Sequence, residues 1–298
     1  MSTSVSIVRC GNYDSDLVYE KVKESIDLLG GIHSFVKPGE KVLIKPNLLK
    51  ARPPDAAVTT HPEVVRAVIR LVRQAGGAPV VGDSPGIGEE DDVLRRVGIL
   101  EVMEEEGAFL ADFTECAKVQ GHGRFRYVEI AKSAVDADAI INLPKLKTHG
   151  MMVMTGAVKN LFGCVPGKRK VQWHFNTGID HESFARMLVE LVILLKPRLT
   201  VIDAVMAMEG NGPGSGDPRH LGLIIAGEDT VALDVVSGMI VGLSPLQLPV
   251  IRAARAIGIG ESTIDRISVL GENIDDIKVA DFRMPPLMNT EWPIPEWA

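Results

Sequence analysis

The first 81 residues alternate short apolar runs with segments of helical periodicity, and this alternation constrains the fold most strongly. The apolar runs lie at 5–8, 41–44 and 79–81. Between them, apolar residues recur every three or four positions until glycine pairs at 30–31 and 76–77, a pattern typical of amphipathic helices. Because helix-length crossovers join parallel strands, this β-α-β-α-β order predicts an α/β protein with a mostly parallel, doubly wound sheet.

Each buried run is followed by a polar loop that contains proline or glycine. Lys-Pro-Asn at 45–47 follows the second run, Gly-Asp-Ser-Pro-Gly at 82–86 follows the third, and residues 142–149 follow a further run at 139–141. Loops at the carboxyl ends of parallel strands form the ligand crevice of such sheets. We therefore expect these loops to converge, together with the glycine-rich loop 210–216.

The remaining chain adds further predicted elements. We expect two short acidic helices within 89–107, a β-hairpin around 121–123, a helix capped by Asp180, a helix over 246–256 and a late strand at 277–279. Thr60 to Glu63 has the pattern of a capping box that begins the second helix. We expect one α/β domain over residues 1–283, followed by a Pro-rich tail at 284–298.

A basic segment interrupts an otherwise acidic chain. The net charge is −7, yet residues 139–179 contain five Lys, one Arg, two His and no Asp or Glu. A positive island of this kind can attract an anion, although a solvated basic loop is the alternative. We expect residues 144–180 to form a less regular, basic lobe that covers the crevice.

The polar residues of these loops supply the candidate site. We predict that Lys159, His149 and Asp83 act in catalysis, with Lys and His in proton transfer. The ammonium of Lys159 is expected to be held by Asn160 or a neighbouring carbonyl. The residues predicted to bind an anionic cofactor or substrate are Lys45, Asn47, Lys145, Lys147, Gly212, Gly214 and Ser215.

The glycine-rich loop does not have a known nucleotide-binding pattern. It lacks the Lys-Ser/Thr ending of a P-loop, and the first strand lacks a GxGxxG turn. Backbone N–H groups in such a loop can still bind an anion. A tight structural turn is the alternative.

Composition argues against several classes of protein. An acidic chain with a pI near 5.6 does not resemble a nucleic-acid-binding domain. The three cysteines, Cys10, Cys116 and Cys164, form no CxxC pair, so we expect no disulfide framework. No signal peptide or membrane-spanning run is apparent, and we predict a cytoplasmic protein that binds neither membrane nor nucleic acid.

No metal site is predicted from histidine spacing. His149, His174 and His181 flank the basic segment without the i, i+4 spacing of a helical metal pair. Each is a candidate general acid or base or a hydrogen-bonded structural residue. A metal held by a distant His with Asp203 or Asp229 is the open alternative.

Six motifs occur in a recognisable order. They are Lys-Pro-Asn at 45–47, Thr-His-Pro-Glu at 60–63, Gly-Asp-Ser-Pro-Gly at 82–86, Leu-Pro-Lys-Leu-Lys-Thr-His at 143–149, Gly-Ala-Val-Lys-Asn-Leu-Phe-Gly at 156–163 and Gly-Pro-Gly-Ser-Gly-Asp-Pro-Arg at 212–219. Over about residues 3–283 the chain thereby resembles the DUF362 family, a domain of unknown function. That family is also distantly similar to the lactate racemase superfamily.

The resemblance implies a link to iron–sulfur proteins. Family members are often fused to, or followed by, a ferredoxin-like domain with two 4Fe–4S clusters. This sequence departs from that arrangement because it has no cysteine cluster. We expect no iron–sulfur cluster within the chain, and a redox role would then use a separate ferredoxin. The cofactor is otherwise unknown.

The favoured hypothesis is an enzyme that acts on a small or medium anionic organic substrate by redox- or isomerase-type chemistry. One alternative is a non-catalytic module that binds an anion or cofactor and works with a separate ferredoxin. The other is a metal-dependent hydrolase.

Overall fold

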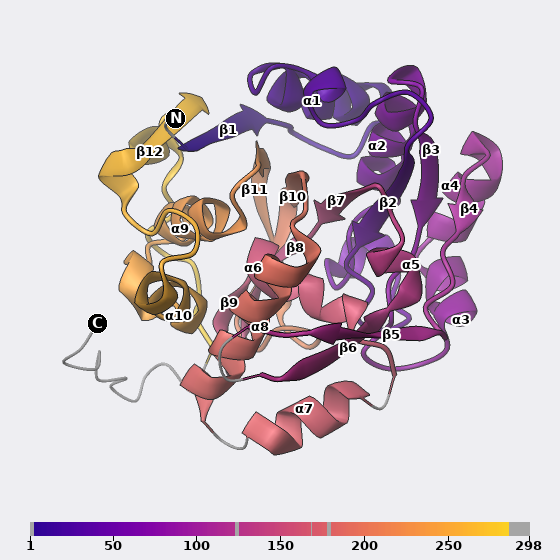
Figure 1. The fold of residues 1–298 in the computed structure, drawn as a ribbon. Coiled ribbons are helices and arrows are strands. Elements are labelled where there is room, and N and C mark those ends of the chain that lie inside the picture. The colour runs from indigo at the N-terminus through magenta and orange to yellow at the C-terminus, as the bar shows by residue number, and fades with distance from the viewer. Residues whose placement is uncertain (1–2, 123–124, 168, 178–179, 286–298) are drawn as a thin grey trace.

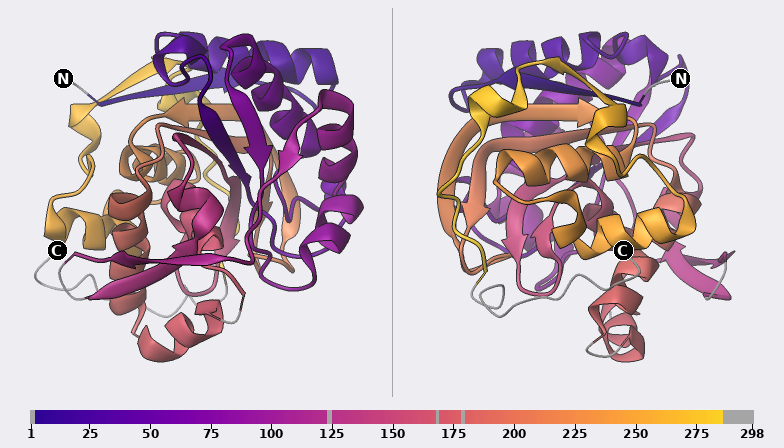
Figure 2. Two further views of the ribbon diagram at one scale, coloured as in Figure 1. Left: turned by 45° about the vertical axis from the view of Figure 1, so that its right-hand side comes forward. Right: turned by 90° about the vertical axis from the view of Figure 1, so that its left-hand side faces the viewer.

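The computed structural model describes residues 3–122, 125–167, 169–177 and 180–285. Figures 1 and 2 show a central sheet with helices on both faces. Apart from residues 284 and 285, the expected Pro-rich tail lies outside the described residues.

The central sheet is mixed but mostly parallel, which confirms the predicted fold class. In spatial order its main strands are β12 (Ile267–Gly271), β1 (Thr3–Arg9), β11 (Asp217–Gly227), β10 (Leu199–Glu209), β7 (Ala139–Leu143), β2 (Lys41–Pro46), β3 (Ala78–Val81) and β4 (Phe109–Leu110). Every pair from β10 to β4 is parallel. Strand β11 is antiparallel to both its neighbours, because the glycine-rich loop returns it directly alongside β10.

Side chains of the sheet alternate between two hydrophobic cores. On β2, Val42 and Ile44 belong to one core and Leu43 to the other, as the two-residue period of a strand requires. The first core is completed by α1 (Ser15–Asp27), α2 (Pro62–Gln74), α3 (Glu90–Arg96) and α4 (Ile99–Glu106). The second is completed by α6 (Ala157–Asn160), α8 (His181–Leu195), α9 (Thr230–Ile240) and α10 (Pro249–Ile257).

The basic segment contains more regular structure than the sequence indicates. It forms β8 (Lys145–His149), β9 (Val153–Thr155), α6, a 3-10 helix (Leu161–Cys164) and α7 (Arg169–Thr177). Strand β8 pairs with β10 in parallel and with β9 in antiparallel fashion. Lys145 and Lys147, two positions apart on β8, are both buried. The alternative of a solvated loop is therefore wrong for these two lysines.

Several local predictions are confirmed. Helices α3 and α4 occupy the acidic stretch, Asp180 caps α8, and β5 (Cys116–Gln120) pairs antiparallel with β6 (Tyr127–Ala131) as the expected hairpin. The short helix α5 (Lys132–Val135) follows β6. The remaining 3-10 helices are Ile32–Ser34, Pro54–Ala56, Pro245–Gln247 and Ile264–Arg266. The last of these, Ile264–Arg266, leads directly into β12.

Two local predictions are wrong. The expected strand at 277–279 is replaced by α11 (Ile274–Ile277), because the Asn273 side chain accepts the Asp275 N–H and starts a helical turn. The second helix is capped by His61 rather than Thr60. The Thr60 hydroxyl instead accepts the Asn47 N–H (2.9 Å) and donates to the Leu143 carbonyl (2.6 Å), which ties two strand ends together.

Because the sheet is packed against a hydrophobic core on each face, truncation of a buried sheet residue should lower the stability of the protein. Leu43→Ala removes a fully buried side chain, so it should lower the free energy of unfolding by about 2–5 kcal/mol. Val135→Ala, at a 42% exposed position, should change it by less than about 0.5 kcal/mol. Urea denaturation measures both. Equal effects would contradict the described packing.

Candidate functional site

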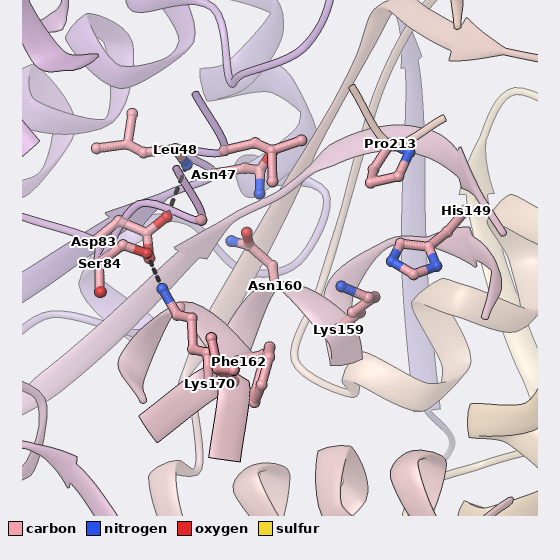
Figure 3. A pocket seen from close by; sticks show the side chains of 14 residues that line it. Asn47, Leu48, Asp83, Ser84, His149, Lys159, Asn160, Phe162, Lys170 and Pro213 are labelled. Carbon is pink, nitrogen blue, oxygen red and sulfur yellow. Dashed lines mark hydrogen bonds between the residues drawn. The ribbon is translucent and has the colours of Figure 1, made fainter. Parts of the chain in front are cut away.

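The predicted loops meet at the carboxyl ends of the parallel strands. They line a cavity of about 260 Å³, here called the larger cavity, and an adjoining smaller cavity of about 40 Å³. Asn47, Asp83, His149 and Pro213 each bring one of the four loops to the larger cavity (Figure 3). Residues that line both cavities are Asn47, Leu49, Lys159, Asn160 and Pro213. The expectation of one shared crevice is thus confirmed.

A buried ion pair joins β2 to the loop after β3. Lys45 Nζ lies 2.8 Å from Asp83 Oδ1, and both side chains are inaccessible to solvent. Asp83 Oδ2 accepts the Leu48 N–H at 2.7 Å, while Lys45 also donates to the Pro46 carbonyl at 3.0 Å. A buried charge is stable only when it is paired and hydrogen-bonded. Lys45 and Asp83 therefore neutralise each other at the wall of the crevice.

A second ion pair lies deeper. Lys145 Nζ contacts Asp203 Oδ2 at 2.7 Å and donates to the Tyr13 hydroxyl at 2.8 Å. Tyr13 in turn donates to Asp203 Oδ1 at 2.7 Å. Burial, followed by the charge of Asp203, raises the pKa of Tyr13 far above its ordinary value, so the phenol stays protonated.

The Tyr13 ring also packs against His61. The two rings are stacked with centroids 3.6 Å apart and an interplanar angle of 4°. Burial lowers the pKa of His61 to about 4, which keeps the imidazole neutral near neutral pH. Sequence reasoning missed both as site residues: Tyr13 lies in no motif, and the pattern around His61 predicts only the start of a helix.

Three lysines at the crevice have no carboxylate partner among the described residues. Lys147 donates to Asn47 Oδ1 and the Val58 carbonyl, both at 2.7 Å. Lys170, from α7, donates to the carbonyl of Ser84 (Figure 3) and to that of Pro85. Lys159 is half-buried, and its ammonium lies 5.9 Å from the centroid of the Phe162 ring.

Burial shifts the pKa of all three ammonium groups downward. The pKa of Lys147 lies well below its ordinary value because of burial and then the charge of Lys159. Burial, followed by neighbouring lysine charges, lowers the pKa of Lys159 to about 8. Burial is the largest cause that lowers the pKa of Lys170 to about 8; the charge of Lys45 adds to this shift, and the charges of Asp83 and Glu90 oppose it. Lys170 was not among the predicted site residues, since only the fold brings α7 to the loop at 84–85.

Helix α6 presents Lys159 to the crevice. Its first N–H groups, from Ala157 and Val158, donate to the buried Asp234 at 2.6 and 3.1 Å. At its end, Asn160 Nδ2 donates to Asn142 Oδ1 (2.8 Å) and the Lys45 carbonyl (3.3 Å). The expectation that Asn160 holds the Lys159 ammonium is wrong, because the Asn160 Oδ1 acceptor has no hydrogen-bond partner among the described residues.

His149 ends β8 and also lines the larger cavity. Its Nδ1 accepts the N–H groups of Met151 and Met152 at 3.0 and 3.2 Å. The neutral ring must then carry its proton on Nε2. His181, at the start of α8, is not among the residues that line either cavity. The side chain of His174 lies outside the described residues.

The glycine-rich loop is anchored to β8 through Thr148. The Gly212 N–H donates to the Gly210 carbonyl (2.9 Å) and to Thr148 Oγ1 (3.2 Å). A side chain at Gly212 would overlap the Thr148 backbone. Pro213 reaches both cavities, whereas Gly212, Gly214 and the exposed Ser215 line neither. Ligand binding by those three residues stays a prediction.

The family model described as "Domain of unknown function (DUF362)" matches residues 42–238. This chain belongs to the DUF362 family. The matched region holds both buried Lys–Asp pairs and the three lysines that lack a carboxylate; Tyr13 lies outside it. The resemblance identified from the six motifs is thus confirmed.

Two further proteins are similar to this DUF362 chain. The "Thylakoid-associated protein sll1697" of Synechocystis sp. is 39% identical over 289 residues, which cover 96% of this chain and 90% of that protein. The lactate racemase apoprotein of Thermoanaerobacterium thermosaccharolyticum superposes with a TM-score of 0.49 and 12% identity. The superposition covers 76% of this chain and 54% of the racemase, so the chain spans about half of that structure.

Two observations on the described residues concern metal binding and membrane-spanning helices. No three His, Cys, Asp or Glu side chains in this part of the chain are grouped so that they could hold a metal ion. None of its helices is both long and apolar enough to cross a membrane. The name of the Synechocystis relative refers to the thylakoid, and a cytoplasmic location for this chain stays a prediction.

The Lys45–Asp83 pair leaves no space for a side chain at Gly163. A Cβ there would overlap the Asp83 carboxylate and the Lys45 ammonium. Gly163→Ala should therefore lower the free energy of unfolding by about 1–3 kcal/mol. Gly11→Ala is the matched control, since a Cβ at Gly11 meets no atom within 4 Å. Calorimetric melting compares them, and an unchanged melting temperature for Gly163→Ala would refute the close packing.

Proposed function

We propose that this DUF362 protein is an enzyme that binds a small or medium organic anion in the crevice, with Lys159 as the group that exchanges a proton with it. The observation that carries the proposal is the position of Lys159. Its side chain lines both cavities and is half-buried, and no carboxylate or hydrogen-bond partner holds its ammonium among the described residues. An anionic substrate would supply the missing partner.

The pKa of Lys159 suits proton transfer. An acid or base works best when its pKa lies near the operating pH. With a pKa lowered to about 8 by burial, Lys159 can exist in either protonation state near neutral pH. His149 lines the larger cavity together with Lys159, and it is the second proposed proton-transfer group.

Two reaction types use such a proton transfer. An isomerase removes a proton from the carbon beside a carboxylate and returns it to another position or face. A redox enzyme removes the same proton and a second proton from the neighbouring oxygen or carbon atom, and the two electrons released pass to a carrier; a separate ferredoxin is the carrier that we propose for that case. In both cases Lys159 receives the proton on Nζ while its amine is neutral, and the ammonium groups of the neighbouring lysines stabilise the added negative charge of the transition state.

The proposal predicts that Lys159→Met loses binding without losing stability. Loss of a charge-assisted hydrogen bond costs about 1.5–3 kcal/mol, or roughly ten- to a hundredfold in affinity. The melting temperature should stay the same or rise, because the variant removes a half-buried charge that has no carboxylate partner. Calorimetric titration with sulfate and simple carboxylates, compared with a thermal melt, measures both effects.

The matched control for this variant is Lys37→Met. Lys37 is exposed and precedes β2, so it lies at the end of that strand opposite the crevice. The change should leave anion affinity unaltered. His149→Gln should weaken binding in the same direction as Lys159→Met. Unchanged affinity in both crevice variants would show that the lysines do not bind an anion.

The lowered pKa values also predict how binding depends on pH. Lys159 and Lys170, each with a pKa of about 8, are charged below that value and neutral above it. Affinity for sulfate, whose own charge is constant, should therefore fall by about tenfold or more as the pH rises from about 7 to about 9. Lys159→Met should flatten this dependence. A profile that falls only near the ordinary lysine pKa would contradict the burial of these groups.

A further inference from the structure

The charges around the crevice do not balance. Asp83 is the one carboxylate among the described residues that line the two cavities, and it is paired with Lys45. Lys145 is paired with Asp203. The three remaining lysines, Lys147, Lys159 and Lys170, bond to amide or carbonyl oxygens or face the cavity. A ligand with a single negative charge would leave much of this positive charge uncompensated.

The positive charge is spread along the crevice rather than gathered at one point. Lys170 lines only the larger cavity, Lys147 only the smaller one, and Lys159 lines both. In Figure 3, Lys170 points toward Asp83 and Ser84, whereas Lys159 lies on the His149 side of Asn160. A ligand that meets all three lysines must therefore carry negative charge at two separate positions.

The cavity sizes fit such a ligand. The smaller cavity, at about 40 Å³, exceeds the roughly 10–15 Å³ that one water molecule needs, so it has room for a group of a few atoms. The larger cavity, at about 260 Å³, is lined by apolar side chains as well as by cations: Leu48, Leu49, Phe162, Val171 and Pro213. A carboxylate fits the first space, and a short carbon skeleton with a second anionic group fits the other.

We propose that the ligand of this crevice is an organic dianion with its charges at opposite ends, a short dicarboxylate. One carboxylate occupies the smaller cavity between Lys147 and Lys159, and the other faces Lys170 in the larger cavity. This inference rests on the proposed function, because it names the class of anion that the crevice binds.

Binding of a dicarboxylate should draw protons from solution. Burial depresses the pKa of each of these lysines in the empty crevice, and a nearby negative charge raises the pKa of an ammonium group. The lysines therefore become more fully protonated in the complex. Proton uptake therefore distinguishes binding at the lysines of the crevice from binding at exposed surface lysines, whose ammonium groups are already fully protonated near neutral pH.

The test compares each dicarboxylate with its own monoamide. Malonate, succinate and glutarate have the same shape as their monoamides but one more charge. Calorimetric titration of the full chain near neutral pH should show at least one dicarboxylate binding about tenfold or more tightly than its monoamide. Repeating the titration in buffers of different ionisation enthalpy should show proton uptake. Lys170→Met should remove the preference, and Lys37→Met should keep it.

Three results would overturn the inference. If each dicarboxylate and its monoamide bind equally, the crevice binds an anion but does not select a dianion. If glycerol phosphate binds more tightly than every dicarboxylate, both charges lie at one position rather than two. If no anion binds to the unaltered protein, the proposed function fails as well.

Discussion

The crevice depends on the pairing of two buried lysines with two aspartates, one that follows β3 and one that lies within β10. Lys45 and Asp83 link β2 to the loop after β3, and Lys145 and Asp203 link β8 to β10. An unpaired ammonium inside the protein would be strongly destabilising. The Lys145–Asp203 pair coincides with the backbone register of β8 against β10, so a slip of that strand would bury both charges without partners. Removal of Asp203 would leave the Lys145 ammonium buried without its partner.

The same arrangement leaves the crevice positively charged. Lys147 follows Lys145 at the next inward position of β8 and is buried, yet its only partners among the described residues are an amide and a carbonyl oxygen. Lys159 and Lys170 add charge from two helices. Proteins keep such costly groups where function needs them, and the two neutral ion pairs beside them hold the surrounding loops in place. The fold is thus stable although the positive charges of Lys147, Lys159 and Lys170 destabilise it locally, and we propose that a bound anion neutralises them.

Sequence alone predicted those parts of the site that are set by local pattern. Lys45, Asp83 and Asn47 follow strands whose apolar character is plain, and the sheet geometry brings such loops together. Contacts between distant segments were missed. Tyr13 meets Asp203 across 190 residues, and Lys170 meets Ser84 only because α7 returns to the crevice. The burial of the two lysines of β8 was not predicted, because no local signal shows that a basic strand will join the sheet beside β10.

Lys159 is a half-buried cation at the crevice with no carboxylate partner among the described residues, and we propose that a bound anion supplies that partner. Titration of the side-chain NMR signals of isotope-labelled lysines, with the Lys159 signal assigned from its loss in Lys159→Met, measures this directly. We expect a pKa of about 8 for Lys159 in the free protein and a clear rise of this pKa when succinate is bound. A pKa near the ordinary 10.5, unmoved by any carboxylate, would contradict the proposal.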